Sequence, residues 1–345
     1  MKIQVLAVVG LALLFAGCDD STVARDSVAI VETDYNNDGI VDQTATLTYS
    51  SETGQLLTQE WDYADATVED LLVTYEYDDN GFKSREEMTN VSDDSVVFAL
   101  TQVNDERGNA LEVHYDYDND GIANRIDYRT YSSDNDITRE AYDFNADGTI
   151  NRERLYTFAS AGQFSTRSFD DNGDGLFEYY ETVDYEPGNR REIRFLIDRN
   201  GDRNFDEEYF ATWTDNPDGT LTRLLERDTD MSGSIDRTDT RIMLTDDMRE
   251  YFQKTLSVVR DFDNDGTPDK LESQTFNSRG QILTSSVDND ADGNPDYVTE
   301  YDYDEIGNVT GLRYFNGGNQ SYAMTVTYED WSIGQVELPA LNSNS

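Results

Sequence analysis

The chain repeats one nine-residue pattern, D-x-[DN]-x-D-G-x-x-[DNE], eight times between residues 34 and 296. Oxygen-bearing side chains recur at positions one, three, five and nine of the pattern, and glycine occupies position six in most copies. Ca²⁺ takes roughly six to eight oxygen ligands at 2.3–2.6 Å, and glycine permits the sharp turn that such a loop needs. The pattern therefore predicts several bound Ca²⁺ ions as part of the folded state.

Each copy supplies four candidate side-chain ligands, and the carbonyl at position seven would add a fifth. Mg²⁺ fits less well, because it prefers a smaller octahedral shell and retains its waters. Two copies depart from the pattern, with Arg203 in place of the glycine and Ser232 at position five, and we expect these two sites to be the weakest. The candidate metal ligands are Asp34, Asn36, Asp38, Asp42, Asp116, Asp118, Asp120, Asn124, Asp143, Asn145, Asp147, Asn151, Asp170, Asn172, Asp174, Glu178, Asp198, Asn200, Asp202, Asp206, Asp228, Asp230, Ser232, Asp236, Asp261, Asp263, Asp265, Asp269, Asp288, Asp290, Asp292 and Asp296.

A plain polar turn is the competing interpretation of any single copy, because Asp, Asn and Gly dominate turns. Eight copies with acids at the same offsets favour metal binding for the set. The charge of the chain agrees with this choice. Its formal net charge is −46, which opposes a compact state, and eight Ca²⁺ ions would offset about 16 of these charges.

The spacing of the copies predicts the architecture. Successive copies begin 27 to 33 residues apart, except for one interval of 82 residues, which is close to three periods. Degenerate copies at 62–70 and 90–98 fit that interval, so the chain consists of about ten repeats. Within a repeat, as at 297–315, two runs of alternating apolar and polar residues flank a glycine turn, which is a hairpin pattern.

These features predict an all-β fold in which calcium loops and glycine turns alternate along about ten antiparallel β-hairpin repeats of ~27 residues. We expect a spiral or solenoid-like sheet, with a β-propeller as the alternative. The segment 245–256 is the exception, since one or two helical turns are expected there, either as an insertion between hairpins or as a functional lid. Aromatic residues at strand ends are expected to form core or cross-strand ladders, with a sugar-binding platform as the alternative: Tyr75, Tyr77, Tyr115, Tyr142, Tyr301 and Tyr303.

The loops differ from a helical EF-hand, because strands flank them and position twelve lacks a consistent acidic residue. They resemble the β-hairpin calcium loops of integrin-type propellers and VCBS repeats and the loops of thrombospondin type 3 repeats, and the closest match is 260–271. Separately, 75–81 (YEYDDNG) and 301–307 (YDYDEIG) resemble the YD repeats of the RHS family. These resemblances imply direct ligation by position nine and a wound β-hairpin fold, and no particular activity.

The N-terminus predicts export and lipid attachment. Lys2 precedes an apolar run over 3–15, which is short for a membrane span and typical of a signal peptide. Residues 14–18 (LFAGC) resemble the lipobox of bacterial lipoproteins, which implies that Cys18 becomes the lipidated mature N-terminus; an ordinary secretory signal is the alternative. Cys18 is the only cysteine in the sequence, so no intramolecular disulfide can form.

We therefore expect a signal peptide at 1–17, a lipid-anchored linker at 18–27, a calcium-loop β-repeat domain at 28–334 and a flexible tail at 335–345. The expected location is the bacterial cell envelope, facing the periplasm from the inner or outer membrane or lying on the cell surface. The expected partners are the membrane, through the lipid, and an envelope protein or glycan. Nucleic acid is excluded by the acidic charge.

The favoured function is a calcium-stabilised scaffold or adhesion surface, and the alternative is a carbohydrate- or peptide-binding module. No catalytic residue is nominated. The sole histidine, His114, has no Ser or Cys nucleophile motif beside it. A carboxylate-dependent hydrolase is less favoured, since none of the many acids stands out as a catalytic pair.

Overall fold

The computed structural model describes residues 27–160, 162–244 and 254–329, and these residues form 22 strands and no helix. Consecutive strands are antiparallel neighbours along the whole chain, which confirms the predicted all-β meander of hairpins. The strands are β1 (Ser27–Asp34), β2 (Gln43–Tyr49), β3 (Leu56–Tyr63), β4 (Leu71–Tyr77), β5 (Lys83–Asn90), β6 (Val96–Asn104), β7 (Ala110–Asp116), β8 (Arg125–Tyr131), β9 (Ile137–Asp143), β10 (Arg152–Ser160), β11 (Gln163–Asp170), β12 (Tyr179–Tyr185), β13 (Glu192–Asp198), β14 (Glu207–Asp215), β15 (Leu221–Asp228), β16 (Arg237–Met243), β17 (Thr255–Asp261), β18 (Lys270–Phe276), β19 (Ile282–Asp288), β20 (Tyr297–Tyr303), β21 (Val309–Asn316) and β22 (Asn319–Glu329).

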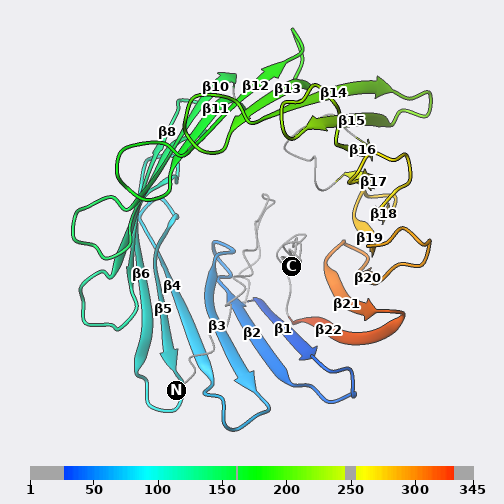
Figure 1. The fold of residues 1–345 in the computed structure, drawn as a ribbon. Helices are drawn as coiled ribbons and strands as arrows, with labels where there is room; N and C mark the ends of the chain where they lie inside the picture. Colours follow the sequence, from blue (N-terminus) through cyan, green and yellow to red (C-terminus); the bar gives the residue numbers. More distant parts are fainter. Residues whose placement is uncertain (1–26, 161, 245–253, 330–345) are drawn as a thin grey trace.

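The sheet closes on itself, because β22 pairs with β1 over seven residues, from Val28↔Glu329 to Asp34↔Ala323 (Figure 1). The expectation of an open spiral or solenoid was wrong in this respect, and so was the alternative of separate propeller blades. The 22 strands form eleven hairpins rather than about ten. Closure depends on pairing between residues almost 300 positions apart, and the local repeat pattern carries no information about it.

The antiparallel meander sorts the connections onto two rims. All eight calcium-type loops lie on one rim, together with the degenerate copies at 62–70 and 90–98, which join β3 to β4 and β5 to β6. We call this the calcium rim, and the opposite edge, with glycine turns such as the one at Gly307, the glycine rim. Most of the expected helical segment 245–256 lies outside the described residues, and its last two residues, Thr255 and Leu256, begin β17.

Alternation along the strands separates an inner from an outer face of the closed sheet, and around β1, β2 and β22 the inner face is apolar. In β2 (QTATLTY) every second residue is buried, including Leu47 and Tyr49. We call the cluster of Ala29, Val31, Ala45, Leu47, Tyr49 and Val326 the apolar wall of the inner face. Threonine is frequent on the outer face, where it suits a pleated surface exposed to water, as in the Thr130 to Thr138 contact.

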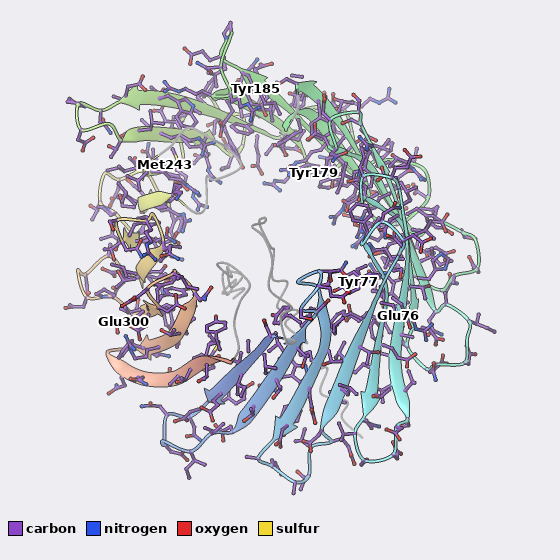
Figure 2. All side chains as sticks on the ribbon, turned by 180° about the vertical axis from the view of Figure 1, so that it is seen from behind. Glu76, Tyr77, Tyr179, Tyr185, Met243 and Glu300 are labelled. Carbon is purple, nitrogen blue, oxygen red and sulfur yellow. The ribbon has the colours of Figure 1, made fainter. Side chains whose placement is uncertain are left out.

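Aromatic side chains on the inner face also join the ends of adjacent strands at the glycine rim. The hydroxyl of Tyr77, which is labelled in Figure 2, donates to the carbonyl of Leu56 at 2.7 Å. That of Tyr303 donates to the carbonyl of Ile282 at 2.8 Å. Equivalent bonds start from Tyr131, Tyr185, Trp213 and Tyr328. The expected structural role of aromatic residues at strand ends is therefore confirmed for Tyr77 and Tyr303.

Candidate functional site

The eight calcium-type loops share one internal hydrogen-bond pattern. In every copy the carboxylate at position one accepts the backbone N–H of position six at 2.7–3.0 Å. The side chain at position nine accepts the N–H of position two at 2.5–2.9 Å. Each of these groups keeps a second lone-pair region for a ligand, so the pattern orients the side chains and leaves them able to bind a cation.

The backbone follows the same path in the two copies that depart from the sequence pattern. Position four has φ of 52–73° and position six has φ of 70–91° in all eight loops. Arg203 takes this left-handed conformation at φ 70° despite its side chain, and its N–H bonds Asp198 as a glycine N–H does elsewhere. The departures therefore change side chains and leave the loop shape intact.

Five loops bring three carboxylates together, with oxygens within 4.8 Å of one another. Oxygens bound to one Ca²⁺ at 2.3–2.6 Å can be no more than about 5 Å apart, so this spacing suits one shared ion. In the described chain, the loops that begin at Asp34, Asp143 and Asp198 do not form such a triad, and that at Asp143 has amides at positions three and nine. The triads are Asp116, Asp118 and Asp120; Asp170, Asp174 and Glu178; Asp228, Asp230 and Asp236; Asp261, Asp263 and Asp265; and Asp288, Asp290 and Asp296.

The Asp228 loop has a triad although Ser232 occupies its position five, so this departure does not separate it from the better copies. In the Asp288 loop, the carboxylate of Asp290 lies among other acidic groups. A backbone hydrogen bond from Asp292 lowers the pKa of Asp290, but the charges of Asp292 and Asp296 and the contact with Asp288 raise it overall. A bound divalent cation would remove this repulsion.

Adjacent loops touch one another through position four of one and position eight of the previous one. The side-chain amide of Asn264 donates to the carbonyl of Ile235 at 2.9 Å. At Gly173 and Gly201 the approach is so close that an added Cβ would lie 2.6 Å and 2.2 Å from carbonyl oxygens of the preceding loop. The calcium rim is therefore a row of contacting loops, and glycine at position four is required where the row is tightest.

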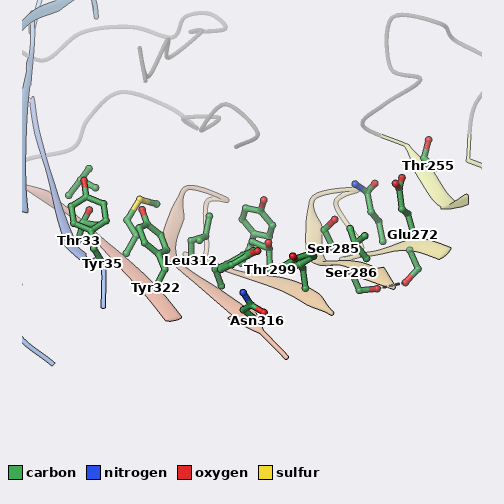
Figure 3. A pocket seen from close by; sticks show the side chains of 18 of the residues that line it. Thr33, Tyr35, Thr255, Glu272, Ser285, Ser286, Thr299, Leu312, Asn316 and Tyr322 are labelled. Atoms are coloured by element: carbon green, nitrogen blue, oxygen red, sulfur yellow. Dashed lines mark hydrogen bonds between the residues drawn. The ribbon is translucent and has the colours of Figure 1, made fainter. Parts of the chain in front are cut away.

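A cavity of about 1150 Å³ lies against the inner face from β16 through β22 to β3 (Figure 3). Four tyrosines on neighbouring strands form part of its wall: Tyr297 and Tyr314 stack at 5.9 Å, Tyr314 is paired with Tyr322 across the strands, and Tyr322 lies 5.9 Å from Tyr35. The remaining lining is mostly amide and hydroxyl side chains, with Arg241, Lys270 and Glu272 at the β16–β18 end. The sequence analysis did not identify this cavity, since strand pairing alone brings its residues together.

Beside the cavity, the inner face from β8 to β18 is lined by ion pairs. Buried Asp127 pairs with Arg125 at 2.7 Å, and buried Glu181 pairs with Arg167 at 2.5 Å. Several guanidinium groups also lie over aromatic rings, as Arg227 does over Tyr209 at 4.9 Å. We call this part of the inner face the charged wall. The sequence signal that could have located it is the frequent arginine directly before or after a calcium loop.

His114 lies on the outer face of β7 with its Nε2 3.0 Å from Glu112. Burial raises the pKa of Glu192, although Arg223, 2.7 Å away, opposes the shift. Neither residue lines the cavity of about 1150 Å³.

Cys18, the predicted signal peptide at 1–17, the predicted linker up to residue 26 and the predicted tail at 335–345 lie outside the described residues. Within the described part of the chain, no helix has the length and apolar character needed to cross a membrane.

No protein-family model matches the chain, and no curated protein matches it. Among solved structures it is similar to TcdB2-TccC3-TEV, with 12% identity and a TM-score of 0.31, over 85% of this chain and 16% of that one. It is also similar to TcdB2-TccC3 (14% identity, TM-score 0.29, 81% and 17% covered) and to a porin-like protein from Bacteroides uniformis ATCC 8492 (11% identity, TM-score 0.25, 90% and 98% covered). The chain spans about a sixth of the length of the first two. At these TM-scores the similarity supports no functional inference.

Proposed function

We propose that the protein is a calcium-stabilised scaffold of the bacterial cell envelope, anchored by lipid at Cys18 and carrying a binding surface on its calcium rim. The observation that supports it most is the shared hydrogen-bond pattern of the eight loops, which presents oxygen ligands at the same places in each. The ions are structural in this proposal, because every loop joins two paired strands and several loops contact the preceding one along the rim.

The direction of the strands relates the anchor to the binding surface. β1 begins at the glycine rim and runs to the calcium rim, so a lipid at Cys18 is tethered to the glycine-rim end of the sheet. The calcium rim exposes large apolar side chains at position seven of several loops, such as Ile40, Ile122 and Leu176. In this proposal these side chains contact the partner, since exposed apolar groups mark a binding surface where they form a contiguous patch. An envelope protein or glycan is the partner that this arrangement would meet.

A second candidate is a carbohydrate- or peptide-binding module, and the inner cavity favours it. The four tyrosines and the amide side chains of its lining are the groups that commonly contact such ligands. Tyr35 is 53% exposed, so at least one of the rings is accessible.

Calcium titration tests the scaffold proposal. At 10 mM Ca²⁺, a loop with a Kd of ~0.5 mM would stabilise the folded state by about 1.8 kcal/mol, so several loops should raise Tm by many degrees. We expect calorimetry of the mature chain to show this rise in Ca²⁺, its loss in chelator, and a weaker response to Mg²⁺. Equal melting curves in Ca²⁺ and chelator, with no calcium detected by elemental analysis, would refute the proposal.

A single substitution tests whether one loop accounts for one bound Ca²⁺ ion. Asp265→Asn keeps an acceptor for the Thr267 N–H, which Asp265 now accepts at 2.7 Å, and removes one carboxylate from a triad. The number of bound ions should fall by about one, because repeats mainly affect their neighbours. The matched control is Asp105→Asn on the glycine rim, where Asp105 likewise accepts backbone N–H groups from Arg107 and Asn109 and the ion count should not change.

A further inference from the structure

In two successive hairpins, two positively charged side chains lie directly opposite each other on the inner face. Arg227 pairs with Arg237 between β15 and β16, and Arg260 pairs with Lys270 between β17 and β18. Like charges at directly opposed positions destabilise a sheet. The other calcium-loop hairpins do not do this: the same register position holds Tyr115 with Arg125, or Ile197 with Glu207.

The carboxylates nearby are too few to balance these cations. Asp239 is contacted by Arg227 at 3.8 Å and by Arg241 and Arg260 at 3.3 Å each, and Glu272 is contacted by Arg260 at 2.5 Å and by Lys270 at 3.2 Å. Four cationic side chains therefore share these two carboxylates, and Arg237, the fifth cation of the group, forms an ion pair with neither of them. This excess lies on the inner face of a protein whose net charge is −46.

Arg237 is the least compensated of the five. Its guanidinium lies 4.3 Å from the ring of Phe262, and its Nε is buried without a hydrogen-bond partner among the described residues, as is the Nε of Arg227. A buried guanidinium donor without an acceptor is costly, and an oxyanion would supply the acceptor.

We propose that Arg227, Arg237 and Arg260 form a binding site for an oxyanion, that is, a carboxylate, sulfate or phosphate group. The guanidinium fork is suited to bidentate contact with such groups. Arg241 and Lys270 next to the cluster line the inner cavity, so the anion is either a free inorganic ion or the acidic group of a larger ligand in that cavity. This site goes beyond the scaffold function and does not depend on whether the loops bind calcium.

Isothermal titration of the full mature chain with sodium sulfate tests the site, with sodium chloride at matched ionic strength as the reference. We expect saturable sulfate binding that chloride does not reproduce. Arg237→Gln should weaken it at least about tenfold, which corresponds to the loss of one charge-assisted contact. Without sulfate, this variant should melt no lower than the wild type, because the substitution removes repulsion. Arg237→Lys keeps the positive charge and loses the guanidinium fork. Its affinity for sulfate should lie between those of the wild type and Arg237→Gln.

The matched control is Arg139→Gln on the outer face, where Arg139 has its own partner in Glu153 at 2.6 Å, and sulfate binding should not change there. The proposal would be overturned if sulfate released no more heat than chloride. It would also be overturned if Arg237→Gln bound sulfate as tightly as the wild type. A sulfated trisaccharide distinguishes the two sources of the anion. Tighter binding than inorganic sulfate indicates a larger ligand in the cavity, and equal binding indicates a free ion at the same site.

Discussion

The apolar wall and the charged wall belong to the same inner face, and they differ in the side chains that line them. On the apolar wall, small and aliphatic side chains such as Ala45 and Leu47 pack against those of the paired strands and are almost fully buried. On the charged wall, buried Asp239 is contacted by Arg241 of its own strand and by Arg227 and Arg260 of the two adjacent strands, and Arg227 also lies over the ring of Tyr209. Long arginine stems can cover apolar surface while their charged ends reach carboxylates or water.

The difference follows from the width of the closed sheet. A ring of 22 strands encloses more space than its own side chains fill, as the cavity of about 1150 Å³ shows. Short aliphatic groups on a wide inner face depend on packing against one another, whereas ion pairs tolerate nearby water at less cost. We therefore expect the two walls to respond to opposite perturbations, the apolar wall to loss of volume and the charged wall to loss of charge and to salt.

The largest effect is expected on the charged wall from Asp239→Asn. Asp239 is 2% exposed, and the substitution leaves three arginines around a neutral amide. Removing one partner of a buried ion pair typically costs about 3–5 kcal/mol, and the low end applies because these arginines keep some contact with water. Chemical denaturation with urea should measure this loss. In 1 M NaCl the loss should shrink, because salt screens the remaining repulsion.

A smaller loss that does not depend on salt is expected on the apolar wall from Leu47→Ala. Leu47 is 1% exposed, and such truncations cost about 2–5 kcal/mol. We expect about 2–3 kcal/mol, because Leu47 borders the inner cavity and the site can relax toward it. The same urea titrations at low and high salt provide the comparison. If Leu47→Ala and Asp239→Asn had equal salt dependence, the proposed difference between the walls would be wrong.

The repeat pattern predicted the local structure well, because local chemistry determines it. The hairpins, the alternation of calcium-type loops with glycine turns, and the degenerate loops at 62–70 and 90–98 all follow from residues within one repeat. Even Arg203 conforms, since the hydrogen bond to Asp198 and the strands on either side hold its backbone in the loop shape. Closure by β1 and β22 and the position of the cavity could not be predicted in this way, because they depend on the number and twist of all the strands.

The charged wall was missed for a different reason. Arg227 and Arg237 flank one calcium loop in the sequence, and strand register places them opposite each other. With 72 acidic residues in the chain, a row of arginines is concealed by the average composition. Charged residues at alternate positions of each predicted strand point to opposite faces, so assigning them by position would have separated the inner from the outer face. The ion occupancy of the loops stays a prediction, although the five carboxylate triads place suitable ligands together.

The smallest effect is expected from the pH dependence of Glu272 on the charged wall. Burial would raise the pKa of Glu272, but hydrogen bonds and ion pairs with Arg260 and Lys270 lower it overall. A carboxyl whose folded pKa lies below its unfolded value stabilises the fold above the unfolded pKa, near 4.5, and this contribution is lost as the pH falls through the folded pKa. Glu272→Gln removes the titrating group and should therefore be less stable than the wild type at pH 6.

That stability difference between wild type and Glu272→Gln should narrow as the pH is lowered from 6 to below 4.5, since protonated Glu272 no longer pairs with Arg260. Urea titrations at several pH values in chelator measure it without a contribution from bound calcium. Leu47→Ala is the control, because it changes no titrating group and its difference from the wild type should stay level. A difference that stays level for Glu272→Gln as well would show that the charged wall gains no stability from this ion pair.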